Sequence, residues 1–175
     1  ACAKSCGQDA IFFDGTDGKA RIDHDRCVGC GRCLGACNFD AISNPESNTN
    51  TILDYKMAEY AKAVVDGRPH FHISLVIDVS PLCDCYGSND VPVLPDLGMF
   101  ASFDPVALDQ ACADACLRQE PLPGSELEEK MHSHGFCDHH DHFKNLEPDS
   151  EWKACLEHAE KIGLGTRSYE LITVK

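Results

Sequence analysis

The chain has 175 residues, a hydrophobic fraction of 43% and a formal net charge of −14 at pH 7, which is enough sequence for one domain with a core or for two small ones. The negative charge argues against a nucleic-acid-binding protein, because phosphates require a basic surface. No apolar run reaches the roughly 18 residues of a membrane span.

Cysteine content is high, at 12 residues. Most of these cysteines have spacings typical of metal sites or helices, so we expect reduced thiols in a reducing, anaerobic cytoplasm. The alternative is an exported protein held together by disulfides.

The chain opens with Cys2 and Cys6, which are separated by three residues and followed by Ala10 and Ile11. Residues 11–22 are expected to form a β-hairpin, because two short β-type stretches flank a turn rich in Asp and Gly. The apolar side chains of this hairpin are predicted to shield a cofactor from water. They are Ile11, Phe13 and Ile22.

A C-x2-C-x2-C-x3-C run follows, formed by Cys27, Cys30, Cys33 and Cys37. This spacing is typical of the iron–sulfur loops of bacterial ferredoxins. Glycines between the cysteines let a tight loop wrap one cluster and leave backbone N–H groups free to face its sulfides. The alternatives are a zinc knuckle, which usually has two separated pairs or mixed Cys/His ligands, and a set of buried thiols.

In two-cluster ferredoxins the fourth cysteine of such a run ligates the other cluster. The same x3-Ala-Ile tail follows Cys6 and Cys37, so Cys2 and Cys6 match the end of an earlier repeat. Cys2 and Cys37 would then belong to a second, incomplete set, and we expect a sequence that starts in mid-protein. One complete four-thiolate set for a [4Fe–4S] cluster is predicted, from Cys6, Cys27, Cys30 and Cys33.

Residues 1–43 are therefore predicted to be a ferredoxin-like iron–sulfur module that is incomplete at its N-terminus, and residues 44–175 to be an α/β portion. A helix is expected from about Ile52 to Asp66 and is ended by Gly67. Its buried face is predicted to contain Met57, Tyr60, Ala61 and Val64.

Residues 70–80 read as a strand that is buried on both faces, as in the centre of an α/β sheet. His70 and His72 are expected on a partly exposed stretch of it, with metal ligation as the lesser alternative.

The loop after this strand carries Cys83 and Cys85. Ligands of α/β folds bind at the carboxyl ends of strands, and a C-x-C pair can offer two thiolates to one metal or cluster edge because its internal disulfide would be strained. The alternative is two packed cysteines in a turn.

Residues 91–102 are expected to be extended, on an edge or loop path, because they contain two prolines. Asp104 and Pro105 predict the start of a helix to about Gln119. Cys112 and Cys116 lie on its apolar stripe, where core packing is favoured over metal binding.

Residues 120–148 are expected to be irregular and contain a cluster of histidines with one cysteine. A zinc or iron site is one interpretation, and a solvated loop that titrates near neutral pH is the other. The candidate ligands are His132, His134, Cys137, His139, His140 and His142.

A last helix is predicted after a cap at Asp149 or Ser150, with Gly163 at its end. A closing strand is predicted over residues 169–174, where polar and apolar residues alternate.

Several stretches outside the cysteine runs resemble ferredoxin-bearing members of the domain-of-unknown-function 362 family. They are residues 56–61, 78–85, 95–98, 101–109 and 162–172. The resemblance implies a larger α/β half ahead of two ferredoxin runs, so this chain would be the C-terminal portion of a longer protein or would need a partner chain. It implies iron–sulfur content but no defined reaction. Two features depart from the family: the first run lacks two cysteines, and Gly7 and Asn38 replace the usual proline after the fourth cysteine.

We therefore expect an α/β fold, or α+β if the chain is complete as given. The expected function is that of an electron-transfer protein or subunit with one or two [4Fe–4S] clusters and a redox partner protein, which the acidic charge suits. The alternatives are a redox enzyme that delivers electrons near Cys83 and Cys85, and a structural iron–sulfur protein. Cys83 and Cys85 are also candidates to replace the ligands missing beside Cys2 and Cys37. No catalytic residue is predicted.

Overall fold

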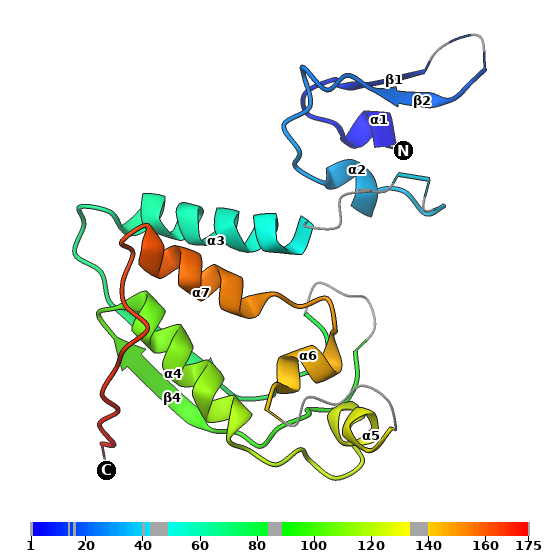
Figure 1. Ribbon diagram of the computed structural model, residues 1–175. Coiled ribbons are helices and arrows are strands. Elements are labelled where there is room, and N and C mark those ends of the chain that lie inside the picture. Colours follow the sequence, from blue (N-terminus) through cyan, green and yellow to red (C-terminus); the bar gives the residue numbers. More distant parts are fainter. Residues whose placement is uncertain are drawn as a thin grey trace. The chain divides into compact units, whose positions relative to one another are not determined.

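The computed structural model shows an α+β chain whose strands form two separate antiparallel pairs (Figure 1). This is the fold class expected for the chain as given, and the described residues contain no parallel sheet. The chain divides into two compact units, Ala1–Ser47 and Asn48–Lys175. The residues that the structure describes are 2–13, 15, 17–39, 41–42, 49–83, 89–133 and 140–174.

The first unit is a hairpin accompanied by two short helices. In chain order its elements are α1 (Cys2–Ser5), β1 (Ile11–Phe13), β2 (Ala20–Ile22) and α2 (Arg32–Gly35). β1 and β2 pair antiparallel with Ile11 opposite Ile22, as the turn formers between them predict. Within the described part of this unit, Ala10 and Ile11 are the buried hydrophobic residues, so its apolar core is very small.

The second unit stacks helices on one face of a two-stranded sheet. Its elements are α3 (Thr49–Val65), β3 (His72–Val76), β4 (Gly98–Ser102), α4 (Pro105–Leu117), α5 (Glu126–His132), α6 (His142–Leu146) and α7 (Trp152–Lys161). α4 packs on β3 and β4, α7 packs on α4, and α3 packs on α7 (Figure 1). β3 and β4 are antiparallel, with His72 opposite Ser102.

Two apolar clusters form the core of this unit. One joins the end of β3 to α4, α5 and α6 through residues that include Val76, Cys116 and Leu127, and Cys112 packs against it. The other joins α3, α4 and α7 through buried residues that include Ala58 and Leu156. The prediction that Cys112 and Cys116 pack in the core is confirmed.

The prediction that the strand of residues 70–80 is buried on both faces is wrong. Phe71, Ile73 and Leu75 are exposed, because in the described part of this unit β3 pairs with β4 alone and the helices pack on the opposite face of the sheet. His70 and His72 are half-buried, as predicted, and their ring nitrogens lie 2.9 Å apart.

The buried face predicted for α3 is also wrong. Met57, Tyr60, Ala61 and Val64 are all exposed, and the helix instead turns Ala58 towards Val106, Leu156 and Ala159. The small Ala58 side chain lets α7 approach α3 closely, whereas the larger apolar residues lie on the opposite side.

Three of the predicted helix ends are found in the structure, and one predicted helix start is not. Gly163 follows the end of α7 with a left-handed φ of 74°, as predicted. The Asp104 side chain caps α4, as predicted, and Gly67 after α3 has a left-handed φ of 68°. α7 begins after Glu151, which makes no side-chain cap, and neither Asp149 nor Ser150 caps it. Residues 169–174 form no strand, because no β-ladder pairs them with β4.

Two helices lie in the stretch expected to be irregular. Ser125 caps α5 by accepting a hydrogen bond from the Glu128 amide, and Asp141 caps α6 by accepting one from the Lys144 amide. Each cap satisfies an amide that the helix itself leaves unpaired.

Candidate metal centre

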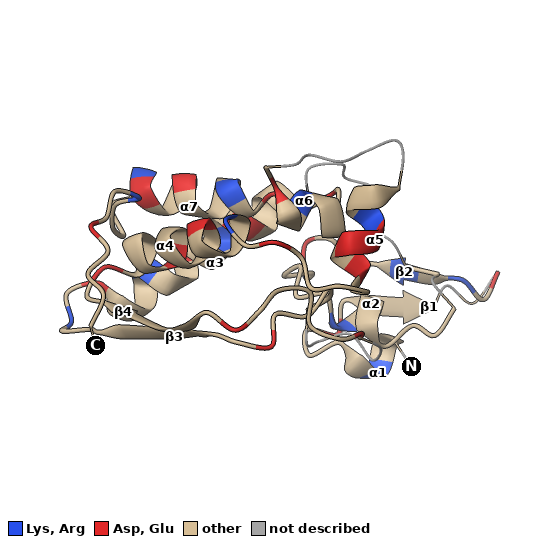
Figure 2. Ribbon diagram, turned by 90° about the horizontal axis from the view of Figure 1, so that it is seen from below, with Lys and Arg blue, Asp and Glu red and all other residues tan. Residues whose placement is uncertain are grey.

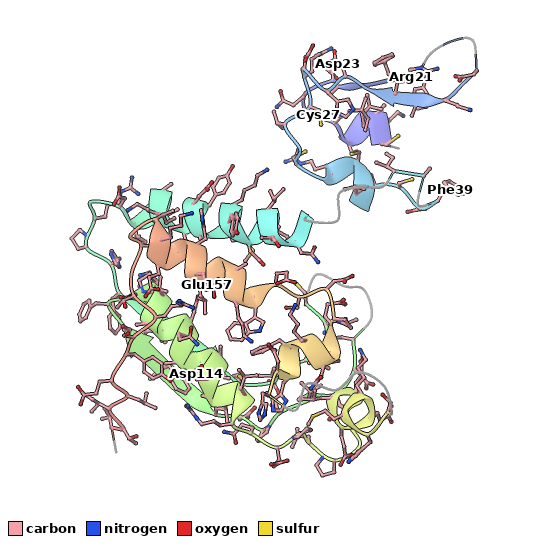
Figure 3. The ribbon with its side chains drawn as sticks, viewed as in Figure 1. Arg21, Asp23, Cys27, Phe39, Asp114 and Glu157 are labelled. Atoms are coloured by element: carbon pink, nitrogen blue, oxygen red, sulfur yellow. The ribbon has the colours of Figure 1, made fainter. Side chains whose placement is uncertain are left out.

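Four cysteines of the first unit line a single pocket, and they are the four assigned to one cluster from their spacing. Cys6 follows α1, Cys30 lies on the loop between β2 and α2, and Cys33 lies in α2. Cys27 lies on the same loop as Cys30, after the end of β2 (Figure 3). The remaining wall is largely apolar. It includes Ala10, Ile11, Ile22 and Val28.

The pocket fits a cluster by the chemistry of its donors. A four-iron cubane needs four thiolates spread over its corners, with apolar side chains around them that limit the access of water. Within the described parts of the chain, no three His, Cys, Asp or Glu side chains are gathered closely enough to hold a single metal ion. A cubane binds one thiolate at each of its iron corners, so its four cysteines surround a common pocket and their sulfurs do not touch one another.

Two glycines give the cysteine loop its course. Gly29 and Gly31 have φ angles of 67° and 73°, a left-handed conformation that other residues adopt only with strain. Gly31 is the residue from which α2 starts. Both glycines therefore adopt the turn conformations that were predicted for them from the sequence.

Backbone amides converge on the sulfur of Cys6. The Ala10 N–H donates to Cys6 Sγ at 3.4 Å. Hydrogen bonds from the Ala10 and Gln8 amides lower the pKa of the Cys6 thiol below its ordinary value. The thiolate is the form that binds iron, and N–H groups directed at sulfur also tune the potential of a cluster.

The hairpin shields the pocket only in part. Ile11 and Ile22 line it, but Phe13 does not and is 56% exposed, so the prediction for Phe13 is wrong. Phe13 is two residues after Ile11 but ends its strand, beyond the pocket. Cys2 and Cys37 are half-buried and do not line this pocket, so their assignment to a second set stays a prediction.

Arg32 lines the pocket and was not singled out from the sequence. Its position between Cys30 and Cys33 is the signal that could have identified it. A cation beside an anionic cluster stabilises the reduced form, since net charge is one of the determinants of potential.

Of the ligands predicted in the second unit, those that the structure describes are not gathered into one site. Cys83 is exposed at the end of a described stretch, and Cys85 lies outside the described residues. Since β3 belongs to an antiparallel pair, the rule that places ligands at the carboxyl ends of parallel strands does not apply to this loop.

The histidine-rich segment is described only at its two ends. His134, Cys137 and His139 lie outside the described residues. His132 is the last residue of α5 and is exposed, and His140 is exposed one residue ahead of the α6 cap. His142 is buried at the start of α6.

Comparison with known proteins gives a family and a partial relative. The family model described as "Domain of unknown function (DUF362)" matches residues 11–114, which is more than half of the chain. A formate dehydrogenase iron–sulfur subunit of Wolinella succinogenes is 44% identical over 46 residues, which cover 26% of this chain and 22% of that protein. The match thus spans about a fifth of the length of this curated relative. No solved structure matches the chain. Among the residues that the structure describes, no helix combines the length and apolar character that crossing a membrane requires.

Proposed function

The chain belongs to the DUF362 family, and we propose that it acts as an iron–sulfur electron-transfer protein or as a subunit with that role. The observation that carries the proposal is a pocket lined both by Cys6 and by Cys27, Cys30 and Cys33, the first three cysteines of a run with ferredoxin spacing. The likeness to a protein named formate dehydrogenase iron–sulfur subunit supports the same cofactor and a role within a larger assembly. In this proposal one [4Fe–4S] cluster is held by Cys6, Cys27, Cys30 and Cys33.

When bound, the cluster supplies reversible one-electron transfer. The protein contributes the surroundings: Ile11 and Ile22 exclude water from one side of the pocket, and the Ala10 amide orients Cys6. Arg32 adds a positive charge at the rim, which favours acceptance of an electron.

A second cluster is the finer part of the proposal. Cys2 and Cys37 would supply two of its ligands, and the other two would come from residues outside the sequence given or from Cys83 and Cys85. A Cys83→Ser/Cys85→Ser variant that still holds two clusters would show that this pair does not complete the second cluster.

The proposed partner is a redox protein with basic patches, in a reducing compartment such as the cytoplasm. The chain's net charge of −14 would steer such a partner towards it, and the association would weaken with salt. A larger N-terminal half, or a separate chain that takes its place, is the other proposed partner.

The test is elemental and spectroscopic analysis of anaerobically purified protein. We expect about four irons and four acid-labile sulfides per chain, and a low-temperature EPR signal after reduction with dithionite. About eight irons would identify the second cluster. Iron that is absent, or replaced by zinc, would refute the electron-transfer proposal, and a cluster that resists reduction would indicate a structural role instead.

Single substitutions assign the ligands. Cys27→Ser and Cys30→Ser should each reduce iron content severely, because each removes a thiolate of the proposed set. Cys112→Ala is the matched control, since Cys112 packs against the core of the second unit and should keep full iron content. A change of reduction state on adding a substrate would favour the redox-enzyme alternative.

A further inference from the structure

The two-stranded sheet of the second unit has an open edge along β3. Among the described residues, β3 pairs with β4 alone. The carbonyl of Val76 accepts a hydrogen bond from the Leu97 amide at 2.8 Å, so the backbone of Val76 points to the β4 side. Backbone groups of successive strand residues point alternately to the two edges. Ile73 and Leu75 therefore direct their N–H and C=O groups to the open edge.

This edge lacks the features that usually protect an edge strand. β3 has the sequence His-Ile-Ser-Leu-Val and contains no lysine, no proline and no acidic residue. The side chains of Ile73 and Leu75 are 58% and 63% exposed. Unpaired, uncharged strand edges of this kind are templates for pairing with a further strand.

A groove runs beside the open edge and has a volume of about 580 Å³. Four consecutive residues, 71–74, line it. Because successive side chains of a strand point to opposite faces, a hollow that touches all four residues lies against the backbone. The opposite wall is largely apolar and includes Val64 of α3, Leu108 of α4 and Leu164, which follows α7. An added strand would thus find hydrogen-bonding groups on one side and apolar side chains on the other.

The groove also contains one carboxylate, that of Asp109 in α4, and no Lys or Arg is among the described residues that line it. Asp109 is exposed, and no described residue forms a hydrogen bond or salt bridge with its carboxylate. The surrounding atoms raise the pKa of this carboxyl by desolvation, and the nearby His72 offsets only part of that effect. A carboxylate that is accessible but poorly hydrated is stabilised by a cationic partner.

We propose that the open edge of β3 binds an extended strand of a partner polypeptide, which adds to the sheet and places a lysine or arginine side chain beside Asp109. In strand addition, main-chain hydrogen bonds supply affinity and pockets for alternate side chains supply specificity. The apolar wall suits β-branched side chains on either side of the cation. A second copy of this chain is a poorer occupant, because two molecules of charge −14 repel each other.

The first test uses the full chain, with its cysteine pocket loaded, and a fluorescein-labelled peptide of sequence Val-Thr-Lys-Thr-Val. In an extended strand the two valines and the lysine of this peptide lie on one face. Fluorescence anisotropy should show binding, and a glutamate in place of the lysine should weaken it roughly tenfold. Methylation of the backbone nitrogens of the peptide should weaken it as much, since it removes the main-chain donors. Equal affinities for the methylated and unmethylated peptides would overturn strand addition.

Variants of the protein separate the carboxylate from the strand edge. Asp109→Asn should remove most of the preference for lysine over glutamate in the peptide, whereas Glu129→Gln, which removes the same charge from an exposed position in α5, should not. An unchanged preference in Asp109→Asn would refute the role of this residue. Ile73→Pro removes an N–H group from the open edge and should abolish binding, while Ile73→Thr keeps that group and should bind.

Amide hydrogen exchange, read residue by residue by NMR, tests the edge without a substitution. In the protein alone, the Ile73 and Leu75 amides should exchange rapidly and the Ser74 amide slowly, because Ser74 faces β4. The lysine peptide should slow exchange at Ile73 and Leu75, and unchanged exchange at saturating peptide would contradict the proposal. Protection of both amides without peptide, increasing with protein concentration, would identify a second copy as the occupant and also overturn it.

Discussion

A single carboxylate, that of Asp104, ties the start of α4 to the chain that follows α7. Its Oδ1 accepts hydrogen bonds from the Val106 and Ala107 amides at 2.9 and 3.0 Å, and its Oδ2 accepts one from the Thr166 amide at 2.9 Å. The backbone of Gly165 lies directly against this carboxylate: a Cβ added there would lie 2.6 Å from Asp104 Cγ.

Gly165→Ala should therefore destabilise the second unit by about 1–3 kcal/mol, the usual range for forcing extra atoms into a packed site. Asp104→Asn should be milder, because asparagine is an equally good helix cap. Urea unfolding followed by circular dichroism would measure both, and an unchanged midpoint for Gly165→Ala would show that the segment after α7 moves away freely.

The charge of Arg32 should be visible in the reduction potential. Arg32→Gln removes a cation from the rim of the cysteine pocket, so the potential should become more negative by on the order of 40 mV, equivalent to about 1 kcal/mol for one electron at an intermediate dielectric. Arg32→Lys keeps the charge and should stay close to wild type. Equal potentials in the Gln and Lys variants, measured by EPR-monitored titration, would contradict the assigned role.

Asp54 in α3 should make stability depend on pH in an unusual direction. Its Oδ2 is buried without a hydrogen-bond partner, and burial together with the nearby Glu151 carboxylate raises its pKa. A raised folded-state pKa means that ionised Asp54 opposes folding at neutral pH, and that the penalty fades as pH falls through that pKa.

We expect Asp54→Asn to stabilise the second unit at pH 7 by about 1 kcal/mol, by removing a poorly solvated charge. The advantage over wild type should shrink as pH approaches about 4, near the pKa of an unfolded aspartate. Denaturant titrations at both pH values provide the comparison, and a difference that grows on acidification would have the wrong sign.

At the scale of elements, the two faces of α3 should respond differently to substitution. Ala58 is 2% exposed and packs against Val106 and Leu156, whereas Tyr60 is 75% exposed. Ala58→Leu should cost about 1–3 kcal/mol through overpacking, and Tyr60→Ser should stay within about 0.5 kcal/mol of wild type. Similar losses in both variants, measured by thermal unfolding, would mean that the outer face of α3 is covered in solution.

The same helix shows what periodicity can predict. The spacing of apolar residues located α3 correctly but not its buried side, because apolar residues occur on more than one face. The buried face of α3 is determined by α7, which lies about a hundred residues later in the chain and packs where Ala58 allows close approach. Local sequence signals predicted the start of α4 correctly, because Asp104 and Pro105 are strong helix-start residues. The helix α5 was not predicted, although Ser125 and Glu128 form the first half of a capping box at its start.

The candidate site was predictable to a similar degree. The spacing of Cys27, Cys30 and Cys33, together with the Ala-Ile tail that Cys6 shares with Cys37, selected the four cysteines that line the pocket. The loop is short, and the left-handed glycines in it fix the path of its backbone. Phe13 is exposed because it ends its strand, beyond the pocket. His142 is buried in a position where its ring bonds the distant Gln119 carbonyl. Residue types give no indication of such contacts.

For the whole molecule, the two units should differ in their need for metal. The described part of the first unit buries little beyond Ala10 and Ile11, too little to fold a segment of this size alone, whereas the second unit has two apolar clusters. Removal of iron by a chelator under oxidising conditions should therefore expose the amides of the first unit to rapid hydrogen exchange and leave those of α4 protected. Protection of both units after iron loss would mean that the hairpin folds without a cluster.

The second unit presents uncharged apolar residues to solvent on two sides. β3 and β4 contain no Lys, Arg, Asp or Glu (Figure 2). Phe71, Ile73 and Leu75 are exposed on the outer face of the sheet, while Met57 and Tyr60 are exposed on α3. Like charges keep such surfaces apart only over the Debye length, which falls from about 8 Å at 0.15 M salt to about 3 Å at 1 M.

Colloidal behaviour follows from this combination. In dilute buffer the net charge of −14 makes neighbouring molecules repel, and light scattering should report small, uniform particles. Raising the ionic strength should turn repulsion into attraction between the bare faces, so the second virial coefficient should change sign. Whether molecules of this protein stay apart in water thus depends on the repulsion between their charges. The salt concentration controls that repulsion, while the apolar surface stays the same.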